Sequence, residues 1–462
     1  MPMQKATIQS QPAPRRALRP AFEAPFISAP ESARTVFLVT LAAACRPLAA
    51  GLIFFGYRAA VVAAVCVVSC AAIERLYYRV TRTPALLGRT HAYLTGLLLA
   101  LTLPPFVPWY IAVIASAFAI IVGKAIFGGV GHFVWQPALV GRLAVAVMFP
   151  VTMNPADWPL LGGRHLLTGD INRVRTIEDY RSWRRAAAPG GADGFRLSPP
   201  RAILAKLTRP PEGAAGQPLP PFSSLAEPRV PQPGRAGERP AVGAATPWWE
   251  KALDGLFGVE PGWSKRRLEP FPGSSPAALR APPPDRLPPI NELLIGARPG
   301  GIGETCAVVI VVAGLYLVYR NYVRWQLPVA FIAAAWCVAA VAPIKLAGPN
   351  GTIETVYVPL LIEGFDVGFT YVNYQILSGE MLLAAVFLAT EMTSRPVTTG
   401  GQVLFGTGCG VLAMIMQLYL NVPIPSYMAV VAMNTLTPAI DSLWRPRPFG
   451  RRHFERLRGV RP

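Results

Sequence analysis

Three acidic residues lie at the ends of apolar segments, where a carboxylate can do chemistry that most of the chain cannot. Glu304 begins one such segment, and Glu380 and Glu391 bracket another, unusually short one. A charge inside a membrane is costly, so acids in such places commonly bind a ligand or carry an ion. The alternative interpretation is that each acid merely ends a helix at the membrane surface, and the residues alone leave both open.

Other kinds of chemistry have little support. The sequence contains no hydrolase triad, no phosphate-binding glycine loop and no zinc-ligand spacing, and its four histidines argue against paired haem ligands within a membrane. Cys66 and Cys70 are four residues apart on one apolar stretch, but two thiols do not close a metal site. We therefore expect no metal site and no disulfide framework, which leaves an organic cofactor, an ion pathway or both.

The composition indicates a membrane protein. The mean hydropathy is +0.37, and only 15% of residues are charged, against roughly 25% in soluble proteins. The net charge of +19 comes from basic residues clustered at the ends of the chain, between apolar runs and in a central segment. That distribution is typical of orientation by the positive-inside rule and argues against nucleic-acid binding.

Ten apolar segments could position the acids, and they form two groups of five. They are residues 36–56, 59–75, 94–103, 109–127, 133–151, 303–319, 326–344, 381–390, 402–420 and 426–443. A membrane span needs about 20 residues, so the third member of each group is abnormally short. Because five is odd, the two groups would be inverted relative to one another. Paired short helices in repeated halves point to a buried ligand site, although Gly and Pro there could simply permit close packing.

The predicted fold is an all-α polytopic membrane protein with about ten transmembrane helices arranged as two inverted five-helix halves. The regions are a disordered basic cytoplasmic tail (1–34), the first half (35–153), a Pro/Arg-rich periplasmic insertion (154–299), the second half (300–444) and a basic cytoplasmic tail (445–462). This topology places every short basic loop on one side. We interpret residues 345–379 as a loop with an interfacial helix rather than an eleventh span, which would break that parity.

Seven strings, in order along the chain, resemble signatures of the RnfD/NqrB family, the flavin-carrying membrane subunits of Rnf and Na+-translocating NADH:quinone oxidoreductase complexes. They are Ala24–Ser28 (APFIS), Leu94–Pro105 (LTGLLLALTLPP), Gly123–Gly129 (GKAIFGG), Pro137–Arg142 (PALVGR), Arg298–Thr305 (RPGGIGET), Ala389–Gln402 (ATEMTSRPVTTGGQ) and Asn434–Asp441 (NTLTPAID). The likeness is closer to RnfD than to NqrB, chiefly at the N-terminus and around Pro396.

The resemblance implies a covalent FMN. Such subunits carry FMN by a phosphoester to a threonine in an S-G-A-T motif on the outer side of the membrane. The candidate is Thr246, in Gly243–Pro247 (GAATP). Gly243 and Ala244 depart from the motif, so an ordinary linker threonine is the alternative interpretation. The topology independently places this segment outside, just before a Trp-rich amphipathic stretch, Pro247–Phe257.

A second flavin is in doubt. The family's N-x-x-N-P motif, whose Asn side chains help hold riboflavin, is here Phe133–Pro137 (FVWQP). Gln136 can still offer an amide, but Phe133 cannot. Glu391 stands where the family has Asp. With Gly303, Glu304 and Thr305 of the RPGGIGET string, Glu391 is the expected end of a flavin site or an ion path.

The resemblance implies an RnfD-like subunit that relays electrons through bound FMN within an ion-translocating complex, rather than an enzyme acting alone. Its expected setting is the bacterial inner membrane, with both termini cytoplasmic. Its expected partners are the lipid bilayer and other Rnf/Nqr-type membrane subunits, especially the FMN-carrying G/C-type subunit. The alternatives are a secondary transporter with inverted repeats and a flavin-free scaffold subunit. The coupling ion, the electron donor and the acceptor stay open.

Overall fold

The structure is a computed structural model that describes residues 32–82, 90–153, 290–296, 300–347, 353–361, 365–420 and 422–443. Thr246 and the Pro247–Phe257 stretch lie outside the described residues. The two predicted tails and nearly all of the predicted insertion also lie outside them.

The first group of helices begins at a capped N-terminus. Ser32 accepts a hydrogen bond from the backbone N–H of Thr35 and starts α1. The helices of this group are α1 (Ala33–Phe55), α2 (Tyr57–Thr81), α3 (Thr90–Thr102), α4 (Trp109–Ala117) with its π-helical continuation η1 (Phe118–Ala125), α5 (Pro137–Met148) and α6 (Pro150–Met153). Pro104 and Pro105 follow α3 directly, and a proline lacks the N–H that would continue a helix, which explains why α3 is short.

The second group repeats the pattern after a short helix, α11 (Ile290–Ile295). Its helices are α12 (Ala307–Tyr319), α13 (Gln326–Val341), α14 (Phe365–Leu377), α15 (Met381–Leu383) with its π-helical continuation η4 (Ala384–Leu388), α16 (Thr399–Ile415) with η5 (Met416–Leu420), and α17 (Pro425–Leu443). By sequence, α11 belongs to the predicted insertion, but Leu293 and Leu294 are buried and the helix packs on α12.

All ten predicted segments are helical, with ends that shift by only a few residues. Among the described residues, three helices are long and apolar enough to cross a membrane, or four if one bent pair counts as a single span. Five further apolar helices are shorter. The protein is therefore mostly helical and compatible with a multi-pass membrane protein. That all ten helices cross the membrane, in two inverted halves, stays a prediction.

The segment 345–379 differs most from the expectation. It contains a two-stranded antiparallel hairpin, β1 (Ile344–Ala347) and β2 (Ile353–Val356), so the described chain is not purely helical. A 3-10 turn, η3 (Pro359–Leu361), and α14 follow. The second part of α14 is buried in the protein, and α14 meets α15–η4 at a bend of 64°. The short eighth segment is thus the second arm of a broken helix.

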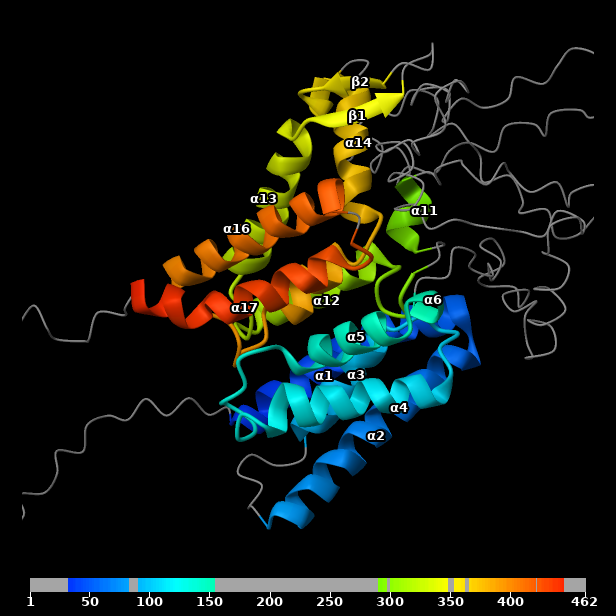
Figure 1. The fold of residues 1–462 in the computed structure, drawn as a ribbon, viewed down its shortest axis with the longest axis vertical. Helices are drawn as coiled ribbons and strands as arrows, with labels where there is room; N and C mark the ends of the chain where they lie inside the picture. Colours follow the sequence, from blue (N-terminus) through cyan, green and yellow to red (C-terminus); the bar gives the residue numbers. More distant parts are fainter. Residues whose placement is uncertain are drawn as a thin grey trace, which may run out of the picture.

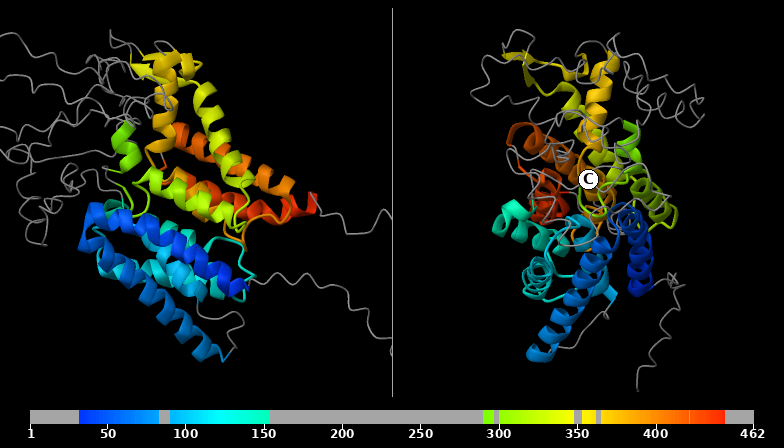
Figure 2. Two further views of the ribbon diagram at one scale, coloured as in Figure 1. Left: turned by 180° about the vertical axis from the view of Figure 1, so that it is seen from behind. Right: turned by 90° about the vertical axis from the view of Figure 1, so that its right-hand side faces the viewer.

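The two groups of helices pack side by side (Figures 1 and 2). Helix α1 packs against α12, and α5 packs against α17, so corresponding members of the two groups meet at the seam between them. In Figure 1, α1 begins and α17 ends on the left, whereas α6 and α11 lie on the right. The breaks before α1 and after α17 therefore share one end of the bundle, and the long gap between α6 and α11 opens at the other end.

The basic loops that the sequence placed on one side do lie together. Arg324 donates to the hydroxyl of Thr399 at 2.6 Å, and Arg395 donates to the carbonyl oxygen of Tyr322 at 3.3 Å. These contacts join the loop after α12 to the loop after η4. Which side of a membrane this end faces stays a prediction.

Candidate functional site

The two short helices, α3 and α15–η4, run in opposite directions at the seam, and each of their shared ends carries a polar cluster. At one end, His91 near the start of α3 meets Glu391 just after η4. At the other end, Thr102 closes α3 close to Arg142, which lies within electrostatic range of Glu380 before α15. Polar groups thus gather where the helices are interrupted, which is where membrane carriers place their ligand sites.

The first of these sites, here called the Arg142 cluster, contains Arg142, Glu304, Glu380, Ser426 and Tyr427. The Arg142 side chain on α5 is 4% exposed, and its Nε donates to the carbonyl oxygen of Thr102 at 2.9 Å. Its charge lies within electrostatic range of Glu304, Glu380 and Tyr427. One guanidinium therefore serves two carboxylates and the end of α3.

Both carboxylates of this cluster are held by the first turn of α17. The backbone N–H of Ser426 donates to Glu380 Oε1 at 3.2 Å, and the hydroxyl of the next residue, Tyr427, donates to Glu304 Oε1. Glu304 Oε2 also accepts from the backbone N–H of Gly301 at 2.9 Å. Backbone N–H groups at a helix start favour negative charge, so this turn is a suitable place for two acids.

The loop that carries Glu304 is fastened to α3 by backbone hydrogen bonds. Ile302 N donates to Leu103 O at 3.0 Å, and Gly303 N donates to Leu101 O at 2.8 Å. These bonds satisfy carbonyls that the end of a helix leaves without partners. A Cβ at Gly303 would lie 2.6 Å from Leu101 Cδ2, so only glycine permits this close approach.

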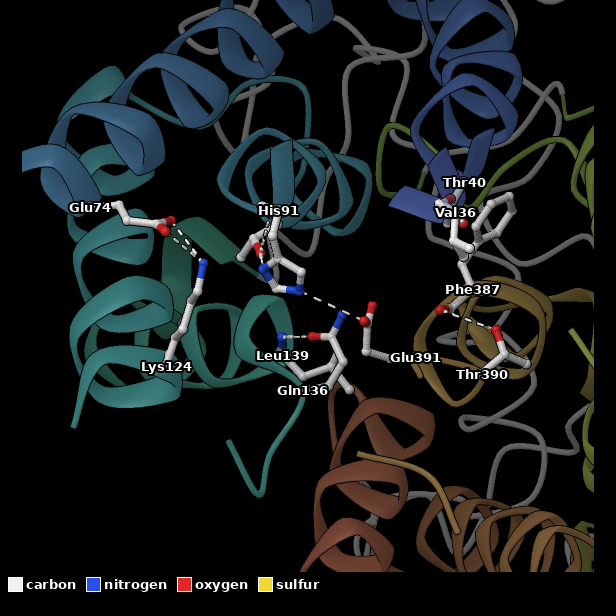
Figure 3. A network of polar contacts seen from close by, with 11 residues as sticks. Val36, Thr40, Glu74, His91, Lys124, Gln136, Leu139, Phe387, Thr390 and Glu391 are labelled. Carbon is white, nitrogen blue, oxygen red and sulfur yellow. Dashed lines mark hydrogen bonds and ion pairs between the residues drawn. The ribbon is translucent and has the colours of Figure 1, made fainter. Parts of the chain in front are cut away.

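The second site, here called the His91 cluster, contains His91, Phe133, Gln136 and Glu391 (Figure 3). His91 Nε2 lies 3.7 Å from Glu391 Oε1, and both side chains are almost fully buried. The other ring nitrogen, Nδ1, is 3.3 Å from the hydroxyl of Thr95. Two phenylalanines enclose the imidazole, Phe37 edge-on at 4.9 Å and Phe133 at 5.4 Å between ring centroids.

Close to this cluster lies a buried ion pair. Lys124 Nζ on η1 contacts both carboxylate oxygens of Glu74 on α2, at 2.8 and 2.9 Å. Lys124 is 1% exposed and also lies within electrostatic range of Glu391 (Figure 3). A buried charge requires such a partner because desolvation is costly. The row of charges therefore extends from α2 in the first group to η4 in the second.

The structure divides the predicted residues between these two sites. Gly303, Glu304 and Thr305 belong to the loop of the Arg142 cluster. Gln136 and Glu391 lie together in the His91 cluster, at the opposite end of the short helices. Thr246 lies outside the described residues, so its relation to either site stays open.

Sequence reasoning assigned no role to several residues of these sites, namely Glu74, His91, Arg142, Ser426 and Tyr427. Lys124 and Arg142 mattered only within motifs or as topology markers. One signal was present, because Glu74 and Lys124 are opposite charges within apolar helices, and buried charges need partners. Nothing in the sequence separation of fifty residues named the pair.

The side chains present do not fit the riboflavin site that the resemblance implies. Gln136 is 1% exposed and its Oε1 already accepts from Leu139 N at 2.9 Å, which caps α5. Phe133 is 2% exposed and packs on His91, so it offers neither a hydrogen bond nor an open space. No step through a riboflavin follows from these residues.

A mostly helical chain with apolar spans, interrupted helices at a seam and buried charges at their ends is a multi-pass membrane protein of the kind that handles ions or cofactors. The model of the NQR2, RnfD, RnfE family matches residues 21–450, and the chain belongs to this family. The match covers both helix groups and the long stretch between them.

Curated relatives carry consistent names, all of them D-type subunits. The chain is 27% identical to that of the "Ion-translocating oxidoreductase complex" of Halorhodospira halophila, over 92% of this chain and 94% of the relative. It is 26% identical to that of the "Proton-translocating ferredoxin:NAD(+) oxidoreductase complex" of Clostridium ljungdahlii, over 87% of each. It is 25% identical to that of the "Na(+)-translocating ferredoxin:NAD(+) oxidoreductase complex" of Acetobacterium woodii, over 92% and 93%. The names agree on the type of subunit and differ on the ion.

Proposed function

We propose that this chain is the D-type subunit of an ion-translocating electron-transport complex, in which it relays electrons through FMN bound covalently to Thr246. The observation that carries the proposal is the family match over residues 21–450, with relatives named as D-type subunits along nearly their whole length. The partners are other membrane subunits of such a complex, especially the FMN-carrying G/C-type subunit, and the setting is the bacterial inner membrane with both termini cytoplasmic.

The protein's own contribution is to fix geometry and charge. FMN, when bound, supplies one- and two-electron redox chemistry. The described residues hold the two helix groups together by backbone hydrogen bonds between Gly303 and Leu101, and they place buried acids at both ends of the short helices. Buried acids and their counter-charges are the groups that an ion-moving subunit needs along its path.

Covalent flavin is the decisive test. The full chain is co-expressed with a flavin transferase, purified, precipitated with acid and run on a denaturing gel under ultraviolet light. We expect a fluorescent band that is absent in Thr246→Ala. The matched control is Thr208→Ala, a threonine of the same predicted insertion, which keeps the band. A band that survives in Thr246→Ala overturns the attachment site.

A secondary transporter is the second candidate, favoured by the helix broken at 64° and by the short α3 at the seam. Protein without any covalent or bound flavin, combined with uptake of a solute into vesicles that contain this chain alone, would support it. Protein without flavin that moves no solute and still assembles with its companion subunits would make the chain a scaffold.

A further inference from the structure

Two buried serine hydroxyls lie beside Glu380 without a hydrogen-bond partner among the described residues. Ser378 precedes Glu380 by two residues and is 4% exposed, and its Oγ is unpaired. Ser426 is fully buried and its backbone N–H holds the Glu380 carboxylate, yet its Oγ is also unpaired. Buried hydroxyls nearly always have partners, so two at one place call for an unseen ligand.

The charge of the cluster indicates which ligand these hydroxyls would share. Glu304 and Glu380 each bring a carboxylate to the start of α17, and Arg142 is the guanidinium that faces both of them. Glu380 is 5% exposed and Arg142 is 4% exposed, so water does little to screen these groups. A place with two acids and one base in a membrane interior favours a cation over an anion.

The carbonyl oxygens at the end of α3 are already occupied. Leu101 O and Leu103 O accept from the glycine-rich loop, Thr102 O accepts from Arg142, and Leu99 O accepts from the Thr102 hydroxyl. A ligand that seeks oxygen atoms is therefore excluded from this side of the cluster and would bind on the side of Glu380.

We propose that the Glu380 carboxylate and the hydroxyls of Ser378 and Ser426 bind a sodium ion at the seam between the two helix groups. Carboxylate and hydroxyl oxygens suit a hard cation. A single positive charge beside Arg142 matches the two acids of the cluster, whereas a divalent cation would leave an excess. The broken helix between α14 and α15 is the type of element that holds such ions in membrane carriers.

This inference deepens the proposed function, on which it rests for the ion-moving role. Its chemistry is separate from flavin chemistry and from the His91 cluster. Three groups of the His, Cys, Asp or Glu kind do not converge anywhere in the described ranges, so the arrangement does not suit a transition metal. The oxygen atoms of serine side chains supply the ligands instead.

The test is sodium binding to the full chain in detergent, with or without its flavin. Thermal unfolding is followed as sodium chloride replaces choline chloride at constant ionic strength, and bound radioactive sodium is counted by equilibrium dialysis. A ligand that binds only the folded protein raises the unfolding midpoint as its concentration rises. We expect saturable protection by sodium, with about one ion bound per chain, because a single carboxylate and its two hydroxyls form one oxygen-lined site.

Glu380→Gln is the decisive variant. Glutamine keeps the shape and can still accept from Ser426 N, but it removes the charge, so we expect the half-saturating sodium concentration to rise about ten-fold or more. The double variant Ser378→Ala, Ser426→Ala should weaken binding without changing charge. The matched control is Ser394→Ala, which removes another buried hydroxyl that is unpaired among the described residues and should leave binding unchanged.

Equal unfolding midpoints in sodium and choline, or the same sodium protection in Glu380→Gln, would overturn the site and indicate water at the serine hydroxyls. These readouts need neither turnover nor flavin. Absence of flavin would therefore refute the electron relay without affecting this result, and absence of sodium binding would refute this site while leaving the covalent flavin intact.

Discussion

His91 Nε2 and Glu391 Oε1 lie 3.7 Å apart, although one residue begins α3 of the first helix group and the other follows η4 of the second. Figure 3 shows the two side chains pointing toward one another across the seam. This contact joins the ends of the short helices opposite to the Arg142 cluster. The two groups are therefore connected by polar contacts at both ends of their interrupted helices.

The imidazole of His91 contributes mainly by filling space between two aromatic rings. We predict that His91→Ala, which leaves a void between Phe37 and Phe133, lowers the free energy of unfolding by about 2–4 kcal/mol. His91→Phe keeps the ring and loses only the Glu391 contact, so it should cost much less. Unfolding by SDS in mixed micelles measures both. Equal losses in the two variants would mean that the contact with Glu391, rather than packing, holds the seam.

The buried pair of Glu74 and Lys124 should be costly to break and cheap to replace. Lys124→Met alone leaves an unpaired buried carboxylate and should cost about 3–5 kcal/mol of unfolding free energy. The double variant Glu74→Leu, Lys124→Met removes both charges and should recover most of that loss. Arg79→Met, on the exposed face of α2, is the control and should change the free energy by no more than about 0.5 kcal/mol. A double variant as unstable as the single one would contradict this account.

Charge balance in the Arg142 cluster leads to a rescue. Arg142→Met leaves Thr102 O without its donor and takes the guanidinium away from two acids, so we expect a loss of about 3–5 kcal/mol. Adding Glu380→Gln removes one of the acids and should recover a large part of this loss, measured again by SDS unfolding. Adding Glu391→Gln at the other cluster should recover nothing. Recovery by both additions would point to a general effect of net charge.

A glycine on α1 permits the close approach of the loop that carries Glu304. A Cβ at Gly51 would meet the backbone carbonyl oxygen of Ile302, which is fixed to α3. Gly51→Ala should therefore displace the loop and cost about 1–3 kcal/mol, as overpacking does. Gly408→Ala is the matched control, because its Cβ would meet only the flexible end of the Met433 side chain. A Gly51→Ala protein as stable as the control would show that the loop can move freely.

The sequence predicted the helices well and their interruptions only in part. Apolar runs of helical length are hard to confuse with anything else in a membrane chain, so all ten segments are helical within a few residues of their predicted ends. The double proline after Thr102 stopped α3 as expected. The hairpin of β1 and β2 and the bend before Met381 were not foreseen, because short strands and helix directions depend on packing partners elsewhere in the chain.

The candidate sites followed the same division. Acids stand out against an apolar background, so Glu304 and Glu391 could be singled out from their surroundings alone. Their partners could not, because Tyr427 binds Glu304 and His91 faces Glu391 across very long separations in the sequence. Arg142 and Ser426 acquire their roles only when α5 and α17 meet at the seam. The sequence carries no direct record of that meeting.

The hydrogen bonds from Ile302 and Gly303 to the end of α3 have a consequence for biogenesis. On the ribosome, the carbonyl groups of Leu101 and Leu103 emerge long before the residues that will satisfy them. Unpaired carbonyls are unfavourable in lipid hydrocarbon, so the end of α3 is not stable there by itself. The first five helices therefore depend on a holding factor, or on delayed entry of α3 into the bilayer, until translation has passed residue 303.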